Sequence, residues 1–89
     1  MTIHRLKSWP SEFRRVFRGA KRHEVRRFDR DFKINDHIIL QEWDPETGNY
    51  TGRVDIRLRI TDITRPGEFG LPPDVGVLSI VDIHREDMD

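Results

Sequence analysis

The sequence predicts an α+β fold that is mainly β: a small closed barrel of about five to six strands, with one short helix near the N-terminus. Alternating polar and apolar residues recur along the chain, and only one segment has helical spacing. The chain has 89 residues, of which 35% are hydrophobic, so it can build only one small core. We expect a barrel rather than a two-layer sandwich, because closing a sheet removes its unpaired strand edges.

The N-terminal region predicts a short strand followed by the helix. Residues 2–7 alternate between the two faces of a strand. Pro10 then lies in the first turn of a helix and Gly19 ends it, which are the positions that these residue types favour. The apolar residues of the helix recur at helical spacing and share one face: Phe13, Val16 and Phe17. Packing of this face is expected to hold so short a helix in place.

Two strands are expected after the helix. Residues 21–28 form the first, in which Glu24 and Arg26 share one face because they are two positions apart. Residues 37–43 form the second, a run of apolar and β-branched residues that ends at a tryptophan.

The second half of the chain predicts a hairpin and a closing strand. Turn-forming residues at 44–49 lead to a strand pattern that resumes at Tyr50. Strict alternation over residues 52–63 predicts a strand with one charged face and one buried face, and the buried face includes Val54. A loop rich in proline follows, and residues 75–83 form the closing strand.

These elements define a single domain at residues 1–83 and an acidic, frayed C-terminal tail at residues 84–89. The composition excludes several classes of protein. The absence of cysteine excludes disulfides and thiolate metal sites, and the four histidines lack the spacing of metal ligands, so we expect no metal and no cofactor. No apolar stretch approaches the roughly 20 residues of a membrane helix, and no apolar segment follows the first basic residues. We therefore expect a cytoplasmic protein.

The net charge of zero conceals a division between the two parts of the chain. Residues 1–33 contain eleven lysines and arginines and four acidic residues, a net charge of +7. Residues 34–89 contain five basic and twelve acidic residues, a net charge of −7. Such asymmetry indicates a basic face for a polyanion. The plainer alternative is that the two halves neutralise one another across the fold.

Several stretches of the sequence carry a family resemblance. They are, in order, Leu6-Lys7-x-Trp9-Pro10, Phe13-x-x-Val16-x-x-Gly19-x-Lys21-x-x-Glu24-x-Arg26, Asp29-Arg30-Asp31-Phe32-x-x-x-Asp36 and Gln41-Glu42-Trp43-Asp44-Pro45-x-Thr47-Gly48-x-Tyr50-Thr51-Gly52-Arg53. Over residues 3–82 the chain resembles the ASCH type of PUA-like domain, and most closely a compact, uncharacterised branch found in phage and bacterial genomes. The resemblance implies a PUA-like barrel with a helix near one end and a cleft beside that helix for RNA or a nucleotide. Asn35 stands where the pattern has glycine, but asparagine also tolerates positive φ, so we expect the turn to be kept.

The resemblance implies a set of RNA- or nucleotide-binding residues in this cleft: Lys7, Trp9, Lys21, Glu24 and Arg26. Lysine and arginine would bind phosphate, and Glu24 would accept a hydrogen bond from a base or a ribose hydroxyl. Trp9 would stack on a base beside Lys7. Two plainer alternatives stay open. Glu24 and Arg26 form an ion pair that braces the helix, or Trp9 packs on the helix that it precedes.

Three functions are compatible with these residues. The first is a module that binds RNA, in particular single-stranded RNA, or a nucleotide. The second is a small hydrolase, a ribonuclease or an enzyme similar to the acetylcytidine amidohydrolases of the resembled group. Lys21 matches the lysine of that group, but Glu24 stands where its threonine nucleophile is expected, and Glu68 is a candidate for its later glutamate only by its place in a loop. The third is an adaptor that binds another protein through the acidic half.

Overall fold

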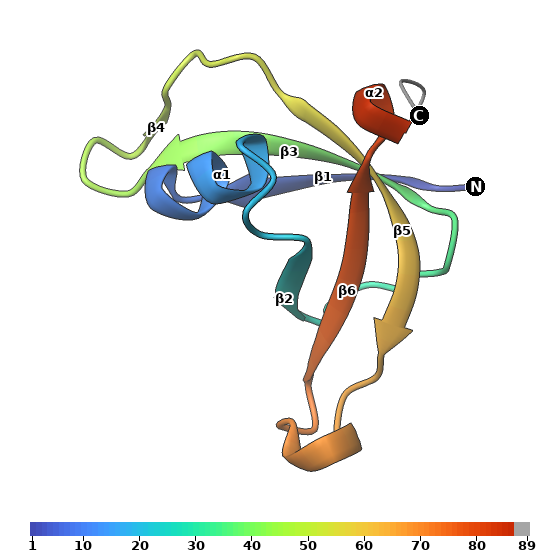
Figure 1. Ribbon diagram of the computed structural model, residues 1–89. Coiled ribbons are helices and arrows are strands. Elements are labelled where there is room, and N and C mark those ends of the chain that lie inside the picture. The colour runs from blue at the N-terminus through green and yellow to red at the C-terminus, as the bar shows by residue number, and fades with distance from the viewer. Residues whose placement is uncertain (87–89) are drawn as a thin grey trace.

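The computed structural model describes residues 1–86, which form one strongly curved sheet with a helix at one end (Figure 1). The strands are β1 (Ile3–Ser8), β2 (His23–Arg27), β3 (His37–Asp44), β4 (Asn49–Tyr50), β5 (Ile56–Thr64) and β6 (Val75–Asp82). The helices are α1 (Pro10–Phe17), the 3₁₀ helix η1 (Glu68–Gly70) and α2 (Ile83–Glu86). The fold is therefore mainly β, as the sequence predicts.

The sheet has the strand order β1-β3-β5-β6-β2, and β4 pairs with β3 outside this path. β1 and β3 are parallel, and the other pairs are antiparallel. Among residues 1–86 the pairing leaves β1 and β2 as the two edges, so the sheet is open. These edges nevertheless approach each other, because Nη2 of Arg26 on β2 donates a hydrogen bond of 2.8 Å to the carbonyl oxygen of Lys7 on β1.

The core lies on the concave face of the sheet, and alternation along the strands decides which residues enter it. On β1 the residues His4, Leu6 and Ser8 are buried while their neighbours are exposed. The apolar core consists of Leu6, Phe13, Val16, Phe32, Ile38, Leu40, Ile56, Leu58, Ile60, Leu78 and Ile80. Strands β1, β3, β5 and β6 contribute apolar residues to this core, and Phe28, just after β2, packs against it.

A buried ionic pair lies where β1 and β3 begin. Nε2 of His4 is 2.9 Å from Oδ2 of Asp36, and both side chains are 5% exposed. The backbone N–H of Thr2 donates to Oδ1 of Asp36, and that of Lys33 donates to Oδ2. Asn35 has a φ of 75°, which confirms the expected turn. The pair therefore joins the start of β1 to the turn that precedes β3.

Helix α1 buries part of its predicted apolar face. Phe13 and Val16 are buried, but Phe17 is 59% exposed, so its expected burial is wrong. Phe17 is the last residue of a helix of eight residues, and the buried face is already filled by the two preceding apolar side chains. Gly19 has a φ of 80°, which fits the positive-φ position that glycine favours after a helix.

Two predicted boundaries in the second half are also wrong. Val54 is 87% exposed, because the chain leaves the sheet after Tyr50 and rejoins it only at Ile56, opposite Leu40. Residues 83–86, where the sequence predicts the end of a strand and the start of a tail, form α2 instead. Nη2 of Arg85 in α2 donates to the carbonyl oxygen of Phe17 at 2.6 Å, which joins the two helices. Residues 87–89 of the predicted tail lie outside the described residues.

No helix within residues 1–86 is both long enough and apolar enough to cross a membrane.

Candidate functional site

The structure brings three of the five predicted site residues into one ionic network beside α1. Glu24 is turned inward by β2, and its side chain is 4% exposed. Its Oε2 accepts a hydrogen bond of 3.0 Å from Nε of Arg26 and lies 2.9 Å from Nη2 of the same residue in an ion pair. Nζ of Lys21 lies 3.9 Å from the other oxygen, Oε1. The ion pair of Glu24 with Arg26, which the sequence leaves open as the plainer alternative, is therefore present.

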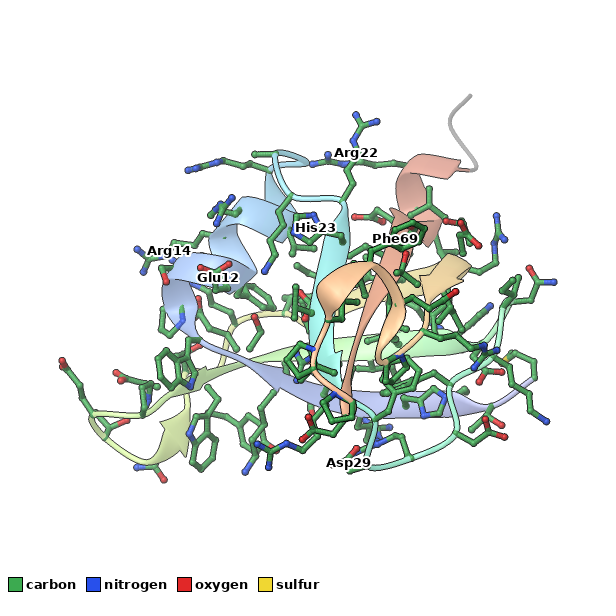
Figure 2. All side chains as sticks on the ribbon, turned by 90° about the horizontal axis from the view of Figure 1, so that it is seen from below. Glu12, Arg14, Arg22, His23, Asp29 and Phe69 are labelled. Atoms are coloured by element: carbon green, nitrogen blue, oxygen red, sulfur yellow. The ribbon has the colours of Figure 1, made fainter. Side chains whose placement is uncertain are left out.

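Glu12 of α1 completes this network, and the sequence analysis missed it. Nζ of Lys21 donates to Oε2 of Glu12 at 2.8 Å, and Figure 2 shows Glu12 on the side of α1 nearer to β2. The hydrogen bond and the charge of Lys21 hold the pKa of Glu12 below its usual range. The helix thus supplies a carboxylate that fixes Lys21 between two acids. A signal was present in the sequence, because Glu12 is an acid in the first turn of the predicted helix, which ends just before Lys21.

Glu24 retains an unused hydrogen-bonding group. Its Oε1 is buried and has no hydrogen-bond partner within residues 1–86, because Lys21 is too far away to donate. An unpartnered buried oxygen is costly, so native proteins keep few of them. This oxygen can accept a hydrogen bond from a donor that reaches the network.

A second buried acid, Glu42 of β3, was also missed. Its side chain is 1% exposed. Its Oε1 accepts a hydrogen bond from the hydroxyl group of Thr51 and lies 3.2 Å from Nε of Arg53. Among the residues that the structure describes, its Oε2 has no hydrogen-bond partner, and it is 4.0 Å from Nε of Arg14. Glu42 lies opposite Ser8 in the register of β1 and β3. A signal was present, because Glu42 continues the buried alternation of Ile38 and Leu40.

The two remaining predicted residues do not form a pair. Trp9 is the N-cap residue of α1 and is 61% exposed. Nζ of Lys7 instead lies over the ring of Trp43, 3.9 Å from its centroid, which is the geometry of a cation–π contact. The aromatic partner of Lys7 is therefore Trp43 on β3, reached because β1 and β3 are parallel neighbours.

A groove of about 380 Å³ lies between the two edges of the sheet. It is lined by Arg5, Leu6, Lys7, Arg26, Arg27, Asp29, Arg30, Phe32, Gln41 and Tyr50. Five of these residues are basic and one, Asp29, is acidic (labelled in Figure 2). The groove owes its charge to the sheet order, which places the basic strands β1 and β2 on facing edges.

A second hollow of about 320 Å³ lies between the end of α1, β6 and α2. It is lined by Val16, Gly19, Lys21, Arg22, Leu58, Ile80, Val81, Asp82 and Arg85. Arg85 crosses it closely, since a Cβ on Gly19 would lie 2.2 Å from its Nη1. This hollow is therefore partly filled by the protein itself, whereas the groove between the sheet edges carries more positive charge.

Glu68 does not join either site. It lies in η1, at the end of β5 and β6 away from α1 (Figure 1), and it is exposed. Its Oε1 accepts the backbone N–H of Arg65 at 2.6 Å. Glu68 therefore stabilises its own loop.

The sheet, the charged groove and the buried glutamates describe a small mainly β protein with a polar site at one end. The chain belongs to the family described as "Domain of unknown function (DUF3850)", which it matches over residues 3–80. It is also 42% identical over 62 residues to the "Uncharacterized 12.9 kDa protein in GpA 3'region" of Escherichia phage P2. That match covers 70% of this chain and 54% of the phage protein, so the chain spans about half the length of its relative.

Proposed function

We propose that the protein binds single-stranded RNA or a nucleotide in the groove between β1 and β2. The observation that carries this proposal is the set of five basic side chains that line one groove beside a tyrosine. Two of them have acidic partners only at the surface. Nε of Arg27 is 3.3 Å from Asp74, and Nε of Arg30 is 3.4 Å from Asp29. Exposed pairs of this kind contribute little, so a phosphate can replace the carboxylate.

The remaining basic residues extend the groove along β1. Arg5 and Lys7 lie two positions apart on the exposed face of the strand, about 7 Å apart along it. This is close to the spacing of successive phosphates along one strand of nucleic acid. Arg5 has no ion-pair partner among residues 1–86. An extended nucleic-acid backbone therefore fits Arg5 and Lys7 better than an isolated phosphate ion does.

The family resemblance supports the same proposal. We propose that the curved sheet is a PUA-like barrel of the ASCH type whose edges are joined by the bond from Arg26 to Lys7. Lys21 and Glu24 then form the wall of the site beside α1, and the exposed groove begins at Arg26. In this arrangement Arg26 belongs to both parts, because it contacts Glu24 and also lines the groove.

A titration of fluorescent single-stranded RNA tests the proposal. At low salt the wild-type protein should bind, and the logarithm of affinity should fall with the logarithm of salt concentration by about 0.7 per phosphate contact. The double variant Arg27→Ala, Arg30→Ala should bind about tenfold more weakly and lower this slope by roughly 1.4.

The matched control is the double variant Arg18→Ala, Arg65→Ala, which removes the same charge from exposed residues outside the groove. It should bind within about twofold of the wild type. Absence of binding at low salt, or equal loss in both double variants, would contradict the groove as the site.

A second function, hydrolysis of RNA or of an acetylated nucleoside, is favoured by one observation. Glu24 holds a buried, unpartnered oxygen 3.9 Å from the amine of Lys21. A carboxylate beside a lysine can accept and return a proton. Incubation with end-labelled RNA and with acetylcytidine should then yield shorter strands or free acetate, and Lys21→Ala should abolish the product. The control is Lys33→Ala, because the side chain of Lys33 is 71% exposed. Absence of product with both substrates would exclude this function.

A further inference from the structure

The β3–β4 hairpin places two aromatic rings and a lysine at one end of the groove, here called the aromatic corner: Lys7, Trp43 and Tyr50. Trp43 and Tyr50 are direct partners in the antiparallel register. Their ring centroids are 5.0 Å apart and their planes meet at 81°, so the rings pack edge to face. The amine of Lys7 lies 3.9 Å from the centroid of Trp43 and 5.7 Å from that of Tyr50.

The two rings differ in accessibility. Trp43 is covered on one side by Lys7, whereas Tyr50 is 51% exposed and lines the groove. The edge-to-face contact fixes the plane of the Tyr50 ring, so part of the ring surface is presented to the groove in a defined orientation.

The hairpin that carries Tyr50 is held by a dense set of local hydrogen bonds. The backbone N–H of Gly48 donates to the carbonyl oxygen of Asp44 at 2.8 Å, and that of Glu46 donates to Oδ1 of Asp44 at 2.9 Å. After Tyr50, the backbone N–H of Thr51 donates a hydrogen bond of 3.2 Å to the carbonyl oxygen of Glu42. The ring is therefore preorganised, which lowers the entropy cost of binding a ligand against it.

We infer that the exposed ring of Tyr50 stacks on an unpaired nucleobase, so that the groove selects single-stranded over double-stranded nucleic acid. This inference rests on the proposed function. A cationic groove binds any polyanion. An exposed aromatic ring at the end of the groove adds affinity only for a ligand that has a free planar face to stack on it. Bases in a duplex are stacked on one another and do not offer that face. Base stacking is thus assigned to Tyr50 and not to Trp9, which does not line the groove.

Gln41 lies beside the corner and supplies a hydrogen-bonding group for the base edge. It lines the groove, and it is next to Lys7 in the register of β1 and β3. Its amide nitrogen makes only a long contact of 3.4 Å with Asp55 at the surface. A stacked base can replace this contact, because an amide both donates and accepts. Lys7 and the arginines of the groove then bind the phosphates on either side of the base.

The experiment compares three probes: a single-stranded oligonucleotide, an abasic strand of the same length and charge, and the same sequence in a duplex, which carries the charge of two strands. Tyr50→Ala should weaken binding of the single strand by about fivefold to a hundredfold. It should leave binding of the abasic strand unchanged. Tyr50→Phe keeps the ring and should bind as the wild type does. Trp9→Ala, which removes an equally exposed aromatic ring outside the groove, should also bind as the wild type does. Circular dichroism of each variant reports that it is folded.

Fluorescence gives a second readout. In the Trp9→Phe protein Trp43 is the one remaining tryptophan. A base that stacks on Tyr50 should change Trp43 emission, and the abasic strand should not. If Tyr50→Ala binds the base-containing and abasic strands as tightly as the wild type, with its salt dependence intact, the stacking inference is overturned while the groove stands. If the wild type binds none of the three probes at low salt, both proposals are overturned.

Discussion

The concave face of the sheet contains two kinds of buried acid, and they differ in how completely their oxygens are hydrogen-bonded. Asp36 lies where β1 and β3 begin, and both of its oxygens accept hydrogen bonds, from Thr2, Lys33 and His4. Glu24 and Glu42 lie toward the other end of β1, and each keeps one buried oxygen without a partner. The same face therefore has a closed polar site at one end and an incompletely bonded one at the other.

The difference distinguishes a structural role from the functional role that we propose for the incompletely bonded end. A buried carboxylate with all of its hydrogen bonds made stabilises the fold, because each bond to a charged group contributes and no group is left unsatisfied. A buried carboxylate with a free oxygen costs stability, and such groups are retained where a ligand or a proton uses them. We therefore expect variants at the two ends to differ in stability and in binding.

The largest expected effect is on stability, at Asp36. Asp36→Asn should lower the free energy of unfolding by about 3 kcal/mol, because the amide nitrogen replaces one accepting oxygen and places its donors against the N–H group of either Thr2 or Lys33. In a domain of this size the loss should lower the melting temperature by more than about 10 °C. Asp31→Asn is the matched control, because Asp31 is 75% exposed and only 3.6 Å from an exposed lysine amine. Thermal unfolding of both variants measures the difference, and an equal effect would show that Asp36 is not a structural carboxylate.

The same carboxylate predicts a dependence of stability on pH. Burial raises the pKa of Asp36, but hydrogen bonds from His4 and from the backbone of Thr2 and Lys33 outweigh it, so the pKa lies below its usual range. The folded state then binds this proton less tightly than the unfolded chain. Its stabilisation is complete above the pH at which an unfolded aspartate titrates, about 4, and is lost as the pH falls through the lower pKa of the folded state.

Urea unfolding at a series of pH values checks this sign. The gap in stability between the wild type and Asp36→Asn should be constant near neutral pH and shrink below about pH 4. The gap between the wild type and Asp31→Asn should change little over the same range. A gap for Asp36→Asn that widens on acidification would mean that its carboxyl group is protonated in the folded protein.

The contrast between the two ends was only partly predictable from the sequence. Alternation predicts local faces well, because it depends on neighbouring residues, and within residues 52–63 it correctly indicated that Leu58 and Ile60 lie on the buried face. It failed at Val54, because whether that residue joins a strand depends on its pairing with β3. The same alternation also indicates that Glu42 is buried, because Glu42 lies on the same face of its strand as the buried Ile38 and Leu40. This indication was not used.

The groove depends on long-range pairing and could not be derived from local pattern. Its charge arises because β1 and β2 are the two edges and face each other, a consequence of sheet order. The sequence pattern paired Lys7 with Trp9 because they are close along the chain. The parallel register of β1 with β3 instead brings Lys7 to Trp43. By contrast, Lys21, Glu24 and Arg26 were implied by the family resemblance, and the spacing of Glu24 and Arg26 along one strand already places these two on one face.

The smallest expected effects on stability are at the glutamates with free oxygens. Glu24→Gln and Glu42→Gln should each change the free energy of unfolding by no more than about 1 kcal/mol, because glutamine keeps an acceptor and removes a buried charge. Glu24→Gln should be the more costly, since Oε2 of Glu24 contacts Arg26 through a hydrogen bond from Nε and an ion pair with Nη2. Chemical denaturation of both variants beside Asp36→Asn measures the contrast. If either glutamine variant lost as much stability as Asp36→Asn, the two ends would be equally structural, and the functional assignment of the glutamate end would lose its physical basis.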